Sequence, residues 1–328
     1  MTEKNVVQTV HDTLWDEMRA DDRVLVLGED VGARGGVFRA TAGFLEEFGE
    51  MRVLDTPLAE SSIVGCAIGM AMHGLLPVAE IQFADFIHPA FDQLVSDAAR
   101  IRYRTAGDWE CPIVVRAPYG GGVHGALYHS QSIEVFYGHV PGLKVVVPST
   151  PYDVKGMLRA AIRDPDPVLF LEHKKTYRLI KGDVPDEPYE VPIGPADVKR
   201  EGEDLTCIAY GLMLHHCLEA AQRLQEEAGA SVEVVDVRTI APLDKETILG
   251  SVGKTGKAMV VSEDNRTYGA AAEISATISE ELMFDLDAPV VRIGGPDIPA
   301  MPFAGPLEHY YMPDVDRIHE RMRELAEF

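Results

Sequence analysis

The sequence contains no long apolar run. No stretch approaches the roughly 18 uninterrupted apolar residues of a membrane-spanning helix. The first residues, MTEKNVVQTVHDTL, include acids and lack the apolar core of a signal peptide. We therefore expect no membrane association and a cytoplasmic protein.

Cysteine and positive charge are also scarce. The four cysteines (Cys66, Cys111, Cys207 and Cys217) lie far apart and form no Cys-x-x-Cys pair, which disfavours a zinc knuckle, a redox motif or a disulfide framework. The sequence has 30 basic and 53 acidic residues, which gives a formal net charge of -23. This charge disfavours nucleic acid and anionic lipid as partners and suits a basic protein partner.

What the sequence does contain is an alternation of helix and strand patterns. Val6, Val10, Leu14 and Met18 recur every four residues, a helical pattern that runs into the apolar strand candidate VLVLG at 24–28. Further strand candidates are RVLD (52–55), PVAEIQF (77–83), PIVVRAP (112–118), LKVVVP (143–148) and PVLFLE (167–172). Helix-length segments between most of them predict an α/β fold, with a parallel sheet covered by helices on both faces.

The length and a second block of this alternation predict two domains. A chain of 328 residues with 46% apolar content exceeds one average domain. Residues 174–204 mix charge with four prolines, which predicts an interruption between domains. After it come strand candidates at 205–211, 232–240, 258–264 and 289–295, and helix candidates at 213–228, 269–283 and after Pro313. We predict domains at 1–185 and 205–328, joined by a linker at 186–204.

Ligands of open parallel sheets gather at the carboxyl ends of the strands, so polar residues after each strand are the candidates for chemistry. Glu60 lies between a strand and a small-residue helix, and is interpreted either as a carboxylate favoured by the helix dipole or as an acid facing a ligand nitrogen. His129 follows a glycine-rich loop and suits acid/base work, although an ordinary loop histidine fits the pattern as well. Its spacing from His124, without a nearby cysteine or paired carboxylate, does not favour a metal site.

Two further places allow a structural and a functional interpretation. Gln82, Phe83 and Phe86 stand at a strand-to-helix junction, where aromatic rings fill a core or stack on a flat heterocycle. Asp164 and Asp166 lie in a proline-containing turn, which needs no ligand but would also suit a hard cation.

Five stretches, in this order, carry a family resemblance that covers essentially the whole chain. They are LGEDVG, DTPLAESSIVGCAIGMA, AEIQFADFIHPAFDQLVSDAARIRYRTAG, GGGVHGALYHSQS and PGLKVVVPSTPYDVKGMLRAAIRDPDPVLFLE. Together they resemble the beta subunit of the thiamine-diphosphate-dependent decarboxylase component of 2-oxoacid dehydrogenase complexes. The resemblance implies an N-terminal aminopyrimidine-binding domain and a C-terminal domain of the transketolase type.

The resemblance also implies roles for single residues. Glu60 matches the carboxylate that hydrogen-bonds the aminopyrimidine and promotes its imino tautomer, and His129 matches a histidine that assists acyl transfer to a lipoyl group. Gln82, Phe86 and Glu29 match positions beside the cofactor, although Phe86 stands where a tyrosine is common. A monovalent cation, potassium in some relatives, is implied at a set of carbonyl and carboxylate positions: Cys111, Ile113, Ala161, Asp164 and Asp166.

The resemblance implies partners as well. Thiamine enzymes bind the diphosphate and Mg²⁺ through a GDG motif, which this sequence lacks. We therefore expect an alpha subunit to hold both, in an assembly of two alpha and two beta chains. A basic domain of the lipoyl-bearing dihydrolipoamide acyltransferase is expected to dock on acidic residues near the C-terminus, although a solvated acidic face explains them equally. These acidic groups are the side chains of Glu280, Glu281, Asp285 and Asp287 and the terminal carboxylate of Phe328.

The loop GGGVHGALYHSQS is more similar to branched-chain members than to pyruvate members. We therefore predict an oxidoreductase of branched-chain amino acid catabolism, of the 3-methyl-2-oxobutanoate dehydrogenase type, with pyruvate or acetoin as alternative substrates. A single-chain transketolase would need the missing GDG motif, and a nicotinamide enzyme would need the G-x-G-x-x-G that LGEDVGARGG lacks. A catalytically silent docking scaffold is the alternative from another class.

Overall fold

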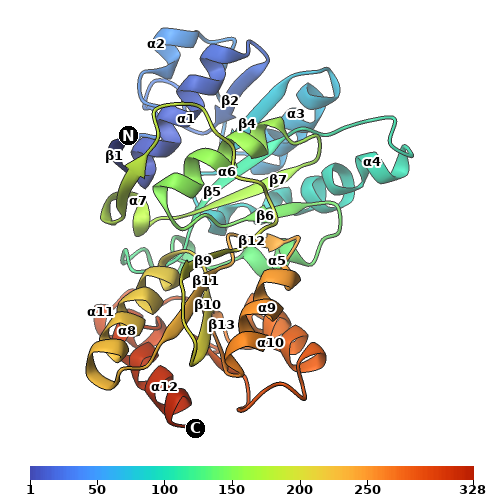
Figure 1. Ribbon diagram of the computed structural model, residues 1–328. Coiled ribbons are helices and arrows are strands. Elements are labelled where there is room, and N and C mark those ends of the chain that lie inside the picture. Colours follow the sequence, from blue (N-terminus) through green and yellow to red (C-terminus); the bar gives the residue numbers. More distant parts are fainter. The chain divides into compact units, whose positions relative to one another are not determined.

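A computed structural model describes residues 1–328 as two compact units, shown in Figure 1. The first comprises 1–119 and 136–193, and the second comprises 120–135 and 194–328. The predicted domain boundaries remain a prediction, and the units differ from them in two places. The loop 120–135 belongs to the second unit because its backbone is bound by carboxylates of that unit, and 186–193 stay in the first unit because Tyr189 and Val191 pack against its core.

The first unit is built on a parallel sheet with the strand order β6-β7-β5-β4-β2-β3. Its strands are β2 (Val24–Gly28), β3 (Val53–Asp55), β4 (Leu76–Glu80), β5 (Val114–Tyr119), β6 (Lys144–Val146) and β7 (Val168–His173), with β1 (Thr2–Asn5) and β8 (Lys181–Val184) paired separately as an antiparallel ribbon. Its helices are α1 (Val6–Ala20), α2 (Phe44–Phe48), α3 (Glu60–Met72), α4 (Ile101–Arg104), α6 (Pro151–Arg163) and α7 (Thr176–Leu179), and α5 (Glu134–Gly138) spans the unit boundary. All the strands predicted for this half are confirmed, with shifted ends.

The helices of the first unit form where their sequences supply caps and an apolar stripe. The side chain of Asn5 accepts a hydrogen bond from Gln8 N and that of Gln8 accepts one from Asn5 N, a capping box that starts α1. The predicted stripe from Val6 to Met18 is fully buried and packs with α6 on one face of the sheet. Helix α3 packs against β4 with side chains outside that cluster, so it covers the other face.

The segment after β4 departs from a regular helix. It consists of short turns (η1, Ala84–Phe86; η2, His88–Ala90), a π-helix (η3, Gln93–Asp97) and a further turn (η4, Ala98–Arg100) before α4. The π-helical turn adds a residue to the helical period. Leu94 and Ala98 are buried, whereas Phe91, just before the π-helical turn, is 40% exposed.

The second unit has a five-stranded sheet in the order β14-β13-β10-β11-β9, parallel except for β9. The strands of this sheet are β9 (Asp197–Arg200), β10 (Leu205–Ala209), β11 (Val232–Asp236), β13 (Ala258–Asn265) and β14 (Val291–Gly295), and the unit also contains the short strand β12 (Thr239–Ala241), which is not part of this sheet. Its helices are α8 (Leu212–Ala228), α9 (Lys245–Thr255), α10 (Ala270–Glu281), α11 (Gly305–Tyr311) and α12 (Val315–Glu327), with a turn η5 at Ala126–Tyr128. Figure 1 shows α8 and α12 on one side of this sheet and α9 and α10 on the other.

One strand prediction for this half is corrected. The strand predicted at 232–240 is divided into β11 and β12, because Arg238 adopts a left-handed backbone (φ 55°) that breaks an extended strand. Strand β9, whose residues fall within the range predicted as a linker, pairs antiparallel with β11. The prediction of parallel sheets covered by helices is confirmed, with β9 as the antiparallel exception. No helix of the chain is both long and apolar enough to cross a membrane, and all four cysteines are free.

Candidate cofactor site

The carboxyl ends of three neighbouring strands of the first unit meet at one edge of the sheet. Gly28, the last residue of β2, is in register with Asp55 of β3 and with Glu80 of β4. The polar residues that follow β2 and β4 therefore lie side by side, and Gln82 Nε2 donates a hydrogen bond to Asp30 Oδ2 at 3.3 Å.

Glu60, the first residue of α3, faces the same cluster. Its carboxylate is half-buried at the positive end of the helix, and no side chain caps that end. Burial raises the pKa of Glu29, and the negative charges of Asp30 and Glu60 raise it further. Three carboxylates thus interact electrostatically at this edge, an environment that favours a ligand with protonated or protonatable nitrogens.

Aromatic side chains form one wall of this edge. The rings of Phe83 and Phe86 meet edge to face with centroids 5.9 Å apart, and Phe38 meets Phe83 in the same way at 5.6 Å. Phe83 and Phe86 are half-buried, so their rings are not wholly enclosed in the core. The predicted neighbours Glu29, Glu60, Gln82 and Phe86 all belong to the first unit.

Beneath the site lies a buried ion network that sequence reasoning missed. Arg116 donates to both oxygens of Glu172 at 2.6 and 2.8 Å and to Glu80 Oε2 at 2.8 Å, and the Tyr177 hydroxyl donates to Glu172 Oε2. Burial raises the pKa of Glu80 above its usual value, and burial also raises the pKa of Tyr177. Gly36, at a φ of 77°, leaves room for this network, since a Cβ there would lie 3.0 Å from Glu80 Oε1.

The network supports the residues of the site. Glu80 ends β4, two residues before Gln82, and the ring of Tyr177 packs on Phe38, which in turn contacts Phe83. The signal in the sequence was a charged residue inside each of two apolar strands, AEIQF and VVRAP. The register of β4 on β5 pairs these two residues, Glu80 and Arg116.

His129 belongs to the second unit, in the loop that follows β5. It comes directly after η5 and is half-buried. Close to the end of this loop, Glu134 is fully buried and accepts a hydrogen bond from the Tyr210 hydroxyl at 2.7 Å. The pKa of Glu134 is raised to about 8 and that of Asp264 to about 6, mainly because burial disfavours the charged carboxylate and, to a lesser degree, because negative charges of neighbouring carboxylates lie close by. Sequence reasoning missed these acids, which are far apart in the chain.

The positions predicted to hold a cation lie at the opposite edge of the first sheet, before β5 and β7. The backbone does gather there, since Cys111 N donates to Pro165 O at 3.0 Å. The carboxylates, however, already have cationic partners: Lys144 Nζ binds Asp164 at 2.6 and 2.5 Å, and Arg102 Nε binds Asp166 at 2.5 Å. No group of three or more acidic, histidine or cysteine side chains of the chain is arranged to hold a metal ion. A cation at this turn would therefore depend on backbone carbonyls, such as those of Ile113 and Ala161.

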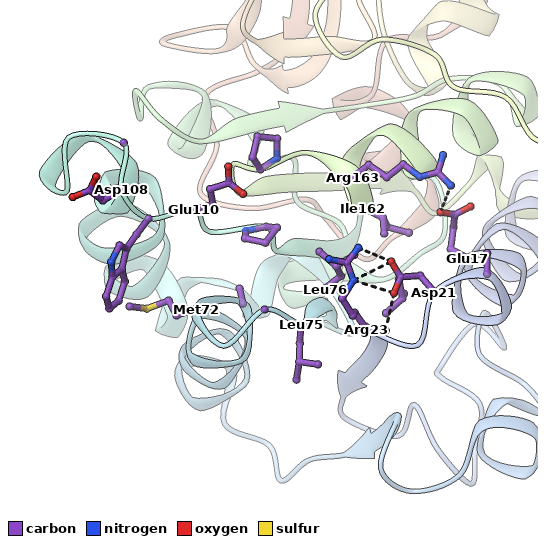
Figure 2. Close-up of a pocket in the computed structure, with 18 residues that line it drawn as sticks. Glu17, Asp21, Arg23, Met72, Leu75, Leu76, Asp108, Glu110, Ile162 and Arg163 are labelled. Carbon is purple, nitrogen blue, oxygen red and sulfur yellow. Dashed lines mark hydrogen bonds and ion pairs between the residues drawn. The ribbon is translucent and has the colours of Figure 1, made fainter.

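A cavity of about 850 Å³ also lies at this opposite edge. Val24 and Leu76, the first residues of β2 and β4, line it together with Trp109. Figure 2 shows its charged walls, where Arg23 binds Asp21 at 2.7 Å and Arg163 binds Glu17 at 2.8 Å. Because this cavity opens at the amino ends of the strands, it is separate from the edge that carries Glu60.

The arrangement of two sheets matches known domains. Residues 3–180 match the transketolase pyrimidine-binding domain and residues 194–318 match the transketolase C-terminal domain. A solved structure titled split gene transketolase, an inactive beta4 tetramer, superposes with a TM-score of 0.78 over 98% of both chains at 22% identity, which shows a shared fold.

Relatives of known name match over the whole length. The chain is 59% identical to the 2-oxoisovalerate dehydrogenase subunit beta of Bacillus subtilis, with all of both chains covered. It is 48% identical to the pyruvate dehydrogenase E1 component subunit beta of the same organism, again with full coverage. The two domains are the pyrimidine-binding and C-terminal modules of transketolase-type, thiamine-diphosphate-dependent proteins. The chain belongs to the family of 2-oxoacid dehydrogenase beta subunits, which are parts of multi-subunit enzymes.

Proposed function

We propose that this chain, with an alpha subunit, forms the decarboxylase component of a branched-chain 2-oxoacid dehydrogenase, of the 3-methyl-2-oxobutanoate dehydrogenase type. The observation that carries this proposal is Glu60 in a cluster of acids beside an aromatic wall, in a chain 59% identical to a 2-oxoisovalerate dehydrogenase beta subunit. The lower identity of 48% to the pyruvate relative favours the branched-chain substrate. Pyruvate is the second candidate.

The residues at the carboxyl edge of the first sheet fit the aminopyrimidine of thiamine diphosphate. Glu60 would accept a hydrogen bond from a ring nitrogen of the cofactor, Phe86 and Phe83 would contact its flat ring, and Gln82 would complete the polar wall next to Glu29. The bound cofactor supplies the electron sink for loss of carbon dioxide from the 2-oxo acid. His129 donates a proton when the acyl group passes to the lipoyl group.

The diphosphate, Mg²⁺ and a monovalent cation are the remaining groups to be placed. The sequence lacks a GDG motif, so the alpha subunit holds the diphosphate and Mg²⁺, in an assembly of two alpha and two beta chains. A potassium ion, if bound at the turn near Cys111 and Ala161, would be held by backbone carbonyls. The carboxylates of Asp164 and Asp166 remain paired with Lys144 and Arg102.

The acyltransferase docks at the end of α10. A hollow of about 610 Å³ is lined there by apolar side chains that include Met283 and Phe328. Met283 and Phe328 are 68% and 73% exposed, Asp287 lines the hollow, and the acids that lie near Met283 in the sequence are exposed as well. These acids are Glu280, Glu281, Asp285 and Asp287. An apolar hollow with an acidic rim suits a small basic domain, whose charges would guide its approach.

The test is reconstitution with a candidate alpha subunit and a lipoyl domain. We expect kcat/KM for 3-methyl-2-oxobutanoate to exceed that for pyruvate. A preference for pyruvate would select the second candidate, and no turnover of any 2-oxo acid in an assembled complex would favour a docking scaffold.

A further inference from the structure

The loop that carries His129 is tied at both ends to one buried carboxylate. Gly120 N donates to Gln131 O at 3.0 Å, which closes the loop. The next residue on each side, Gly121 through its backbone N and Ser132 through its hydroxyl, donates to the same oxygen of Glu263. Glu263 lies in β13 and is 3% exposed, so the base of the loop is anchored to the sheet of the second unit.

A second buried carboxylate, Glu308 of α11, accepts hydrogen bonds from the first half of the loop. Its Oε1 accepts hydrogen bonds from Gly122 N at 3.0 Å and His124 N at 3.1 Å, and its Oε2 lies 2.6 Å from His124 Nδ1. Glu308 is 3% exposed, whereas the side chain of His124 is 63% exposed. A desolvated carboxylate that accepts two backbone hydrogen bonds and pairs with an imidazole strongly favours this one backbone path.

The backbone path that Glu308 selects also determines where His129 lies. His124 and Ala126 both adopt left-handed backbones, with φ of 55° and 58°, at a cost of about 1–3 kcal/mol each that the surrounding contacts must offset. Between them, Gly125 touches the histidine directly: a Cβ on Gly125 would lie 2.7 Å from His129 O and 2.8 Å from His129 Cβ. Release of residues 122–124 would therefore let Gly125 move and take His129 with it.

We infer that Glu308 is a positioning residue for His129, acting through its hydrogen bonds to residues 122–124 and through the contact of Gly125 with the histidine. This inference rests on the proposed role of His129 in acyl transfer. No sequence motif indicates this function for Glu308. Its partner in the loop, Gly122, lies 186 positions away in the sequence.

The experiment uses the assembled alpha–beta enzyme and separates two partial reactions. Decarboxylation is followed with ferricyanide as the electron acceptor, and acyl transfer is followed with a purified lipoyl domain. Glu308→Ala should lower kcat for lipoyl acylation by roughly 100-fold, the cost of misplacing a catalytic group by about 1 Å, while ferricyanide-linked decarboxylation changes by less than about threefold. Glu308→Gln keeps a carbonyl oxygen for the two backbone amides and should remain within about threefold of wild type. Glu320→Ala, on the exposed face of α12, is the matched control.

A second variant keeps the contacts of Glu308 with Gly122 and His124 and displaces His129. Gly125→Ala leaves Glu308 and its partners in place but forces His129 away, so it should show the same selective loss of acylation. Assembly and circular dichroism are checked for both variants. If Glu308→Ala fails to assemble, Gly125→Ala tests the contact through which Glu308 is inferred to act: wild-type acylation overturns the inference, and selective loss supports this step of it.

A double-mutant cycle distinguishes failure of the inference from failure of the proposed function. Glu308→Ala added to His129→Ala should cause no further loss of acylation, because the group it positions is gone. If His129→Ala alone leaves acylation unchanged, the proposed role of His129 is wrong. If His129→Ala slows acylation and Glu308→Ala does not, or if their effects add, the positioning role of Glu308 is wrong.

Discussion

Replacement of Arg116 by methionine should destabilise the first unit more than any single surface change. The side chain is 1% exposed and binds Glu80 and Glu172, so Arg116→Met leaves two buried carboxylates without their cation. Loss of one partner from a buried ion pair costs about 3–5 kcal/mol. With two carboxylates left, we expect about 5 kcal/mol, which at an m-value of about 2.5 kcal/mol/M lowers the urea midpoint by about 2 M.

Tryptophan emission provides an assay of the first unit alone. The chain has two tryptophans, Trp15 and Trp109, and both lie in that unit. In urea titrations, Arg116→Met should unfold at a lower midpoint, whereas wild type and the exposed control Arg104→Met should have similar midpoints. A midpoint for Arg116→Met within ~0.4 M of wild type, about 1 kcal/mol, would refute the account of the network.

A triple variant tests whether unpaired charge is the cause. Glu80→Gln and Glu172→Gln combined with Arg116→Met remove both carboxylates together with the cation, and a carbonyl oxygen at position 172 still accepts from Tyr177. The triple variant should recover most of the stability that Arg116→Met loses, because replacing a whole buried ion network is far less costly than breaking it. A triple variant less stable than Arg116→Met would show that packing, rather than charge, dominates.

Three further predictions concern titration, chemistry and docking. The pKa values of Glu134 and Asp264 are raised, so between about pH 4.5 and pH 8 the folded state holds more protons than the unfolded state and stability falls as pH rises. As pH rises through this window, the free energy of unfolding of Glu134→Gln should therefore increase relative to that of wild type by up to about 1.4 kcal/mol per pH unit. The measurement is the apparent Tm of both proteins against pH, and parallel curves would contradict the prediction. Glu60→Gln should lose at least about 100-fold in decarboxylation with ferricyanide while the complex still assembles, and unchanged turnover would remove its assignment. Glu280→Lys combined with Glu281→Lys should slow association with the acyltransferase by about tenfold at low salt, an effect that high salt should abolish in surface plasmon resonance.

The sequence predicted the fold well where local pattern and fold agree. The stripe from Val6 to Met18, the apolar strands and their alternation with helices reappear as α1 and two parallel sheets. The pattern failed where long-range contacts decide. The left-handed backbone at Arg238 divides a predicted strand, and the π-helical turn at Gln93–Asp97 changes the period of a helix. The loop after β5 is bound by carboxylates of the second unit.

The candidate site was predictable to a similar extent. The rule that ligands gather at the carboxyl ends of parallel strands selected Glu60 and Gln82, which lie at one edge in the structure. The groups that support the site were not predictable from motifs. Arg116 meets Glu80 only through the register of β4 on β5, and Glu308 meets the histidine loop across most of the chain.

The central claim is that this chain holds the aminopyrimidine half of a cofactor site that an alpha subunit completes. The most direct measurement is a calorimetric titration of thiamine diphosphate with Mg²⁺ into the purified chain, into a candidate alpha subunit, and into their mixture. The account predicts tight binding in the mixture and none to the beta chain alone, with weaker binding to a mixture that carries Glu60→Gln. Tight binding to the beta chain alone, or equal affinity for the alpha subunit with and without the beta chain, would contradict it.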